Sequence, residues 1–181
     1  MIKAICVATA LLSAAFMSSE AANAGEGRYY DKTFSSKYYS GSRDRQYQVY
    51  VPPGYDGSTP VPLVMVLHGC DQTEQDVVDD WHFDRRADEN NFIVVFPFIT
   101  SYSGMRASNC WGFWFSSEIH EGAGEVEDLH QIAVEVENTF NIDGNRRYIT
   151  GLSSGGAITE AAAISHNEYW AAAAPVAGLA Y

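Results

Sequence analysis

The spacing of apolar and polar positions along the chain predicts β-strands that alternate with α-helices. Residues 47–51 alternate apolar and polar side chains, which is typical of a half-buried strand. The continuous apolar runs at 63–67 and 92–96 are typical of strands buried on both faces of a parallel sheet. Two shorter strands are expected at 147–150 and 171–176. Parallel neighbours need crossover connections, so helices should lie between these strands.

The segments between the strands have helical character. Apolar residues in 125–140 recur at spacings of three and four: Val126, Leu129, Ala133, Val136 and Phe140. This predicts an amphipathic helix. Thr73 followed by Asp76 resembles a helix start for 73–90, without the Glu or Gln of a full capping box. A third helix, rich in small residues, is expected at 155–165. The alternation predicts an α/β domain with a mostly parallel, doubly wound sheet.

Two segments interrupt this alternation. Residues 25–45 are rich in Ser, Tyr, Gly and charged residues without a sustained period, which predicts an exposed lead-in that becomes ordered near Gln46. Residues 101–125 combine Gly, Ser and aromatic residues, and a loop of this length is often functional.

The first 24 residues are typical of a signal peptide. Lys3 gives a basic start, residues 4–17 are almost wholly apolar, and Ala22-Asn23-Ala24 offers a small-x-small cleavage site. A retained membrane anchor is the alternative, but the apolar stretch is shorter than the ~20 residues that span a bilayer. We therefore predict export to the medium or the periplasm, with a signal peptide at 1–24, the lead-in at 25–45 and one α/β domain at 46–181.

Export changes the interpretation of the cysteines. Cys6 leaves with the signal peptide, so Cys70 and Cys110 remain in a chain sent to an oxidising compartment. One disulfide between them is expected. The alternative is two separate buried thiols, which behave as small apolar side chains.

Charge and histidine spacing exclude some partners. The formal net charge is −12, and Asp and Glu are scattered between Asp71 and Glu168 without forming one block. Such acidity argues against nucleic acid or an anionic membrane as a partner. His82, His120 and His130 show no paired metal-ligand spacing, so no metal site is expected.

The segment 151–156, Gly-Leu-Ser-Ser-Gly-Gly, fits the G-x-S-x-G pattern at the junction of a predicted strand and a predicted helix. A serine held at such a sharp turn takes up a strained backbone conformation, and flanking glycines remove side chains that would clash there. The following helix directs its N–H groups and positive dipole end toward the substrate oxygen. Ser153 is thus the predicted nucleophile; the alternative is a Gly/Ser turn that only caps a helix.

A second part of the same site is expected where the strand 63–67 ends in His68-Gly69-Cys70. With this motif, one oxyanion donor is the backbone N–H after the nucleophile, here Ser154. The other donor comes from the loop after an early strand, here Cys70.

A Cys70–Cys110 disulfide would hold this loop still and bring the aromatic segment 111–115 over the cleft. Trp111 and Trp114 are then the predicted substrate-binding residues. The alternative is that these aromatic residues form ordinary core under a long loop.

Neither nearby histidine is expected to act as the catalytic base. His68 sits at a strand end before a glycine, where it should shape the loop. His166 lies near the end of the helix that starts at Ser153, roughly 20 Å away at ~1.5 Å per residue.

Four segments carry a family resemblance in the same order along the chain: 47–57, 67–72, 109–111 and 151–156. Together they resemble the secreted polyhydroxybutyrate depolymerases and the related feruloyl and acetyl-xylan esterases, which have the α/β-hydrolase fold. The resemblance implies an extracellular serine esterase that hydrolyses carboxylic esters through an acyl-enzyme without a cofactor. It implies a polyester or a polysaccharide ester as the substrate.

One feature departs from that family pattern. α/β-Hydrolases place the triad in the chain order Ser, then Asp or Glu, then His. After Ser153 the sequence has no Asp, and its titratable candidates are Glu160, Glu168 and His166. We therefore expect a C-terminally incomplete catalytic domain that lacks the triad Asp and His. A non-catalytic secreted polymer-binding remnant is the alternative from another functional class.

Overall fold

The computed structural model describes residues 26–99 and 108–178. The predicted signal peptide at 1–24 and the start of the predicted loop at 101–125 lie outside the described residues. Within the described ranges, no helix combines the length and apolar composition that a bilayer crossing requires.

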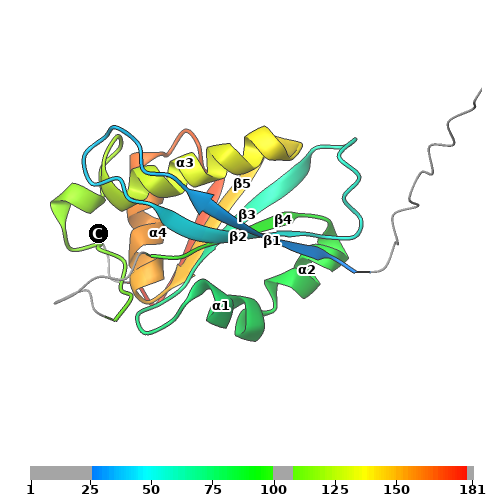
Figure 1. The fold of residues 1–181 in the computed structure, drawn as a ribbon, viewed down its shortest axis with the longest axis horizontal. Helices are drawn as coiled ribbons and strands as arrows, with labels where there is room; N and C mark the ends of the chain where they lie inside the picture. Colours follow the sequence, from blue (N-terminus) through cyan, green and yellow to red (C-terminus); the bar gives the residue numbers. More distant parts are fainter. Residues whose placement is uncertain (1–25, 100–107, 179–181) are drawn as a thin grey trace, which may run out of the picture.

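A six-stranded sheet forms the centre of the molecule, with strand order β1-β2-β4-β3-β5-β6 (Figure 1). Its strands are β1 (Arg28–Phe34), β2 (Arg45–Val51), β3 (Val61–Leu67), β4 (Ile93–Pro97), β5 (Ile142–Leu152) and β6 (Ala172–Val176). β1 pairs with β2, and β2 with β4, in the antiparallel sense, whereas the pairs from β4 to β6 are parallel. The mostly parallel sheet predicted from the sequence is confirmed.

Helices cover both faces of this sheet, as the doubly wound prediction requires (Figure 1). They are α1 (Glu74–Trp81), α2 (Phe83–Asn90), α3 (Gly124–Thr139), α4 (Ser154–Ser165) and the short 3₁₀ turn η2 (Ser116–Glu118). α1 and α2 lie on one face, and α3 and α4 lie on the other. α3 and α4 begin and end within one residue of their predicted bounds.

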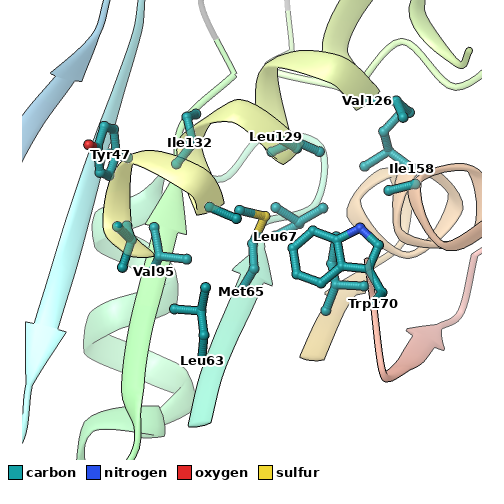
Figure 2. Packing of buried hydrophobic residues seen from close by; sticks show 14 of the residues in the cluster. Tyr47, Leu63, Met65, Leu67, Val95, Val126, Leu129, Ile132, Ile158 and Trp170 are labelled. Carbon is teal, nitrogen blue, oxygen red and sulfur yellow. The ribbon is translucent and has the colours of Figure 1, made fainter. Parts of the chain in front are cut away.

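Alternate residues of the central strands face the two helical layers. Leu63, Met65 and Leu67 of β3 pack toward Leu129 of α3 and Ile158 of α4 (Figure 2). These side chains are buried completely, as expected for a strand sandwiched between helices. This packing fixes the end of β3 against the start of α4.

The opposite face has a smaller apolar cluster. Val66 of β3 and Val94 of β4 pack there with Val77 of α1 and Ala87 of α2. Neighbouring residues on each strand therefore pack into the apolar clusters on opposite faces of the sheet, which explains the continuous apolar runs in the sequence.

The helix predicted over 73–90 is divided in two. His82 adopts a left-handed conformation, with φ 54°, between α1 and α2. Phe83 and Ala87 are out of phase with the apolar stripe of α1, and the break turns both toward the sheet. The start of α1 does carry a complete capping box, in which Asp76 replaces the usual Glu or Gln and accepts from the Thr73 N–H.

The prediction of irregular structure before Gln46 is wrong for residues 28–34. This segment forms β1, whose side chains are exposed except for Phe34. Its regularity comes from backbone pairing with β2 along the sheet edge. An edge strand with exposed polar side chains lacks the apolar alternation by which strands are recognised.

The chain between β1 and β2 is fixed by a buried carboxylate on α3. Asp128 accepts hydrogen bonds from the hydroxyls of Tyr39 and Ser42, at 2.5 and 2.7 Å. It also accepts from the Arg43 backbone N–H, at 3.1 Å, and from Arg45 Nε, at 2.7 Å. The side chains of Arg45 and Asp128 are both fully buried, so this ion pair holds the segment against α3.

Candidate active site

Ser153 lies at the sharp turn between β5 and α4. Its backbone has φ 56° and ψ −117°, a conformation that non-glycine residues rarely adopt. Such a conformation costs roughly 1–3 kcal/mol and persists only where the surrounding structure imposes it. The side chain is on the exposed side of the turn. The strand, turn and helix order predicted around the G-x-S-x-G motif is confirmed.

The glycines of this motif allow backbones to approach closely. A Cβ on Gly151 would collide with the Gly155 carbonyl oxygen, and one on Gly155 would collide with the Leu67 and His68 carbonyls. A Cβ on Gly156 would lie 2.6 Å from the Val176 carbonyl oxygen. The turn is therefore wedged between the ends of β3 and β6, which imposes the conformation of Ser153.

The loop after β3 passes beside Ser153. A Cβ built on Gly69 would lie 3.4 Å from the Ser153 Cβ and 3.3 Å from the Leu152 carbonyl oxygen. The Gly69 N–H donates to Gln72 Oε1 at 2.8 Å, and the Ser153 N–H donates to the Val176 carbonyl at 2.9 Å. The first bond closes the loop after β3 on itself, and the second holds Ser153 against the end of β6.

The two N–H groups predicted as oxyanion donors belong to Cys70 and Ser154, the residues that directly follow Gly69 and Ser153 in the chain. Ser154 is the first residue of α4, so its N–H has no carbonyl from a preceding helical turn. Neither this N–H nor that of Cys70 donates to another described residue. Both N–H groups therefore remain the predicted oxyanion donors.

His68 supports the loop from beneath. It is fully buried between the rings of Phe98 and Trp111, with centroids at 5.5 and 5.3 Å. Nε2 accepts from the Ile99 N–H at 3.2 Å, so the proton resides on Nδ1, which donates to the Gly69 carbonyl at 2.8 Å. Burial lowers the pKa of His68 to about 4. A neutral imidazole with both nitrogens engaged shapes the loop, as its position in the sequence suggested.

The predicted disulfide between Cys70 and Cys110 is confirmed, with a Cα–Cα distance of 4.3 Å. It ties the loop after β3 to the aromatic segment 111–115. Trp111 is fully buried, and its Nε1 donates to the His68 carbonyl oxygen at 3.0 Å. The prediction that Trp111 lines the substrate cleft is therefore wrong, because its indole is part of the support for His68.

Trp114 keeps the position expected of a surface residue. It is 40% exposed and packs edge-on against Phe113, with ring centroids 4.8 Å apart. Glu125, in the first turn of α3, anchors the aromatic segment: its fully buried carboxylate accepts from the Gly112 N–H at 2.7 Å. Sequence reasoning missed this anchor, because an acidic residue in the first turn of a helix is ordinarily explained by the helix dipole.

His166 lies at the opposite end of α4 from Ser153, as predicted. There it meets His130 of α3, with ring centroids 4.1 Å apart, and Glu127. Among the described residues, no imidazole forms a hydrogen bond with the Ser153 hydroxyl. Within the described part of the chain, the predicted nucleophile Ser153 therefore has no imidazole bonded to it.

Residues 45–181 match the family described as esterase PHB depolymerase. The chain is 32% identical over 132 residues to poly(3-hydroxyalkanoate) depolymerase C of Paucimonas lemoignei, covering 73% of this chain and 31% of that protein. It is 31% identical over 127 residues to feruloyl esterase B of Neurospora crassa, covering 68% and 41% respectively. The chain therefore spans less than half the length of these curated relatives.

Solved structures share the fold. The acetyl xylan esterase from Aspergillus awamori superposes with a TM-score of 0.66 at 22% identity, covering 80% of this chain and 50% of that one. At this identity the likeness establishes the common fold. It supports the α/β-hydrolase assignment made from the sequence.

Proposed function

The chain belongs to the PHB depolymerase esterase family, and from this premise we propose that it is a serine esterase whose nucleophile is Ser153. The observation that carries the proposal is the strained conformation of Ser153 between β5 and α4. A turn of this kind raises the serine above the carboxyl edge of the sheet, where substrate can reach it. The alternative of a simple helix cap does not account for this conformation, because Ser153 makes no side-chain cap bond to α4.

In the proposed reaction, the Ser153 hydroxyl oxygen attacks the ester carbonyl carbon, and its proton passes to a general base. The carbonyl oxygen becomes an oxyanion, which the N–H groups of Cys70 and Ser154 bind. The base then gives its proton to the leaving alkoxide oxygen as the ester C–O bond breaks, and water hydrolyses the acyl-enzyme, which releases the carboxylic acid and restores the Ser153 hydroxyl. The 12-residue helix α4 directs its positive end toward the oxyanion.

The substrate class we propose is a polyester of hydroxyalkanoic acids, because the depolymerase of P. lemoignei is a relative at 32% identity. The exposed ring of Trp114 is the proposed contact for the polymer. An ester of a plant polysaccharide is the second candidate, favoured by the 31% identity to a feruloyl esterase.

A polymer-binding protein without catalysis is the candidate from another class. It is favoured by one observation, namely that no imidazole of the described residues reaches Ser153. An enzyme that lacks its base retains catalysis from the oxyanion hole and binding alone, roughly 10³–10⁴-fold over water.

Covalent labelling of the full chain with a fluorophosphonate probe tests the proposal. We expect the adduct on Ser153, located by mass spectrometry, and its loss in Ser153→Ala. Ser154→Ala is the matched control, since it removes the neighbouring hydroxyl and keeps the backbone N–H. A folded chain that binds polyhydroxybutyrate granules without labelling would establish the binding alternative. Release of hydroxybutyrate oligomers or of ferulate would then identify the ester that is cleaved.

Export is a further part of the proposal. The disulfide between Cys70 and Cys110 suits an oxidising compartment. N-terminal sequencing of the protein from the medium and the periplasm would test cleavage after Ala24. A product that starts at Met1 in the cytoplasm would contradict it.

A further inference from the structure

The C-terminal end of α4 meets the first half of α3 in a cluster of two imidazoles and a carboxylate. His166 follows α4, whereas Glu127 and His130 are one turn apart on α3. His166 Nε2 lies 3.1 Å from one oxygen of Glu127, and His130 Nδ1 lies 3.5 Å from the other. One donor atom from each residue falls within 4.8 Å of the other two.

The imidazole of His166 is buried without a hydrogen bond to the described residues. It is 2% exposed, and among the described residues neither of its ring nitrogens has a partner in hydrogen-bonding geometry. Nε2 is close to the Glu127 carboxylate but misaligned for an N–H donor. A buried imidazole without hydrogen-bond partners is unfavourable by about 1–3 kcal/mol, and a bound ligand would remove this cost.

The spacing of these atoms suits a tetrahedral metal ion. Zinc bonds of ~2.0–2.1 Å to nitrogen and oxygen place neighbouring tetrahedral ligands about 3.3 Å apart. The distance from His166 Nε2 to one oxygen of Glu127, 3.1 Å, is close to this value, and His130 Nδ1 lies 3.5 Å from the other oxygen. With one ligand atom from each residue, the three atoms lie within 4.8 Å of one another, so binding requires the side chains to close around the ion.

The Glu127 carboxylate is held in place for this role. One oxygen accepts from the Gly122 N–H at 2.9 Å, and the other accepts from Gln131 Nε2 at 2.8 Å. Each oxygen retains a lone pair for a metal.

We propose that Glu127, His130 and His166 form a Zn²⁺ site that joins α3 to the end of α4. Two imidazoles and a carboxylate are a donor set that suits zinc, and water would complete the tetrahedron. Glu168 lies on the other side of the His166 ring, with Oε1 3.9 Å from Nδ1. Rotation of this exposed side chain would let it accept the Nδ1 proton and orient the ring, as carboxylates do behind zinc-binding histidines.

Calorimetric titration of the untagged, chelator-treated full chain with zinc chloride tests the site. We expect one Zn²⁺ per chain, and at least roughly tenfold weaker binding in His166→Gln and His130→Gln. The melting temperature should rise with zinc in the native sequence and stay constant in these variants. Cobalt in place of zinc should give the visible absorption of a tetrahedral centre.

His82→Asn is the matched control, because it removes an exposed histidine that is not part of the proposed site. Asparagine tolerates the left-handed conformation found at this position. It should bind zinc as tightly as the native sequence. If His166→Gln does not unfold cooperatively, the partly exposed His130 decides the question. Absence of zinc binding, or binding that the His130 and His166 variants retain, would overturn the proposal.

Discussion

At the scale of single residues, the glycines around Ser153 have the most direct structural meaning. Gly155→Ala would place a methyl group against the carbonyl oxygens of Leu67 and His68. Because backbone atoms cannot move aside as a flexible side chain can, we expect the free energy of unfolding to fall by about 1–3 kcal/mol. Urea denaturation measures it. Gly144→Ala is the control, since its Cβ would approach only Arg147, at 3.9 Å. Equal midpoints for the two variants would contradict this account.

A second residue-scale prediction concerns His68 and pH. Its pKa is about 4 in the folded protein, against 6.5 for an ordinary histidine. The unfolded state therefore binds more protons between these values, and the free energy of unfolding should fall as pH decreases from about 6.5 to about 4. The full loss from this group is about 3 kcal/mol.

The pH dependence of the difference between two proteins isolates this contribution. His68→Gln cannot titrate, so its stability should decline less steeply than that of the native sequence over this interval. Carboxylates contribute equally to both curves. Parallel curves would show that His68 does not carry the expected shift.

At the scale of elements, the sequence predicted what depends on local pattern. The strands 63–67 and 92–96 and the helix 125–140 have strong periodicity, and each occurs where expected. β1 was missed because its exposed side chains encode no buried face. The break at His82 was missed because it depends on the sheet. The apolar residues of α1 and α2 cannot all face the sheet on one continuous helix, and the break lets both sets pack on it.

The attachment of the 35–45 segment to α3 gives an element-scale prediction. Asp128→Asn removes the charge that pairs with buried Arg45 and replaces an acceptor with a donor. Leaving a buried guanidinium unpaired should destabilise the fold by about 3–5 kcal/mol. Asp143→Asn breaks a partly exposed pair with Arg146 and should change stability by about 1 kcal/mol or less. Chemical denaturation would compare the free energies of unfolding of the two variants. Similar decreases in both would contradict the expected effect of burial on the Asp128–Arg45 pair.

At the scale of the whole molecule, the sequence located the parts of the site that share one motif. Ser153 and its glycines are contiguous, so the motif can be recognised in the sequence, although the ends of β3 and β6 impose its conformation. The role of Trp111 was misjudged because burial depends on where His68 lies, 43 residues earlier. His130 showed no metal-ligand spacing because only the packing of α3 against α4 brings it next to His166. Contacts between distant segments leave no periodic signal in the chain.

The disulfide is the contact that most constrains the unfolded chain. Cys70 and Cys110 are separated by 40 residues, and closing a loop of this length stabilises the native state by about 4 kcal/mol in the chain-entropy description. In the double variant Cys70→Ala with Cys110→Ala, the free energy of unfolding measured by urea denaturation should therefore be lower by about 4 kcal/mol. Adding a reductant should move the native protein to the same midpoint and leave the variant unchanged.

Because the bond also fixes the loop beside Ser153, fluorophosphonate labelling should slow in parallel. Unchanged labelling with reduced stability would mean that His68 and Trp111 hold the loop without the disulfide, and that its role is confined to the unfolded state.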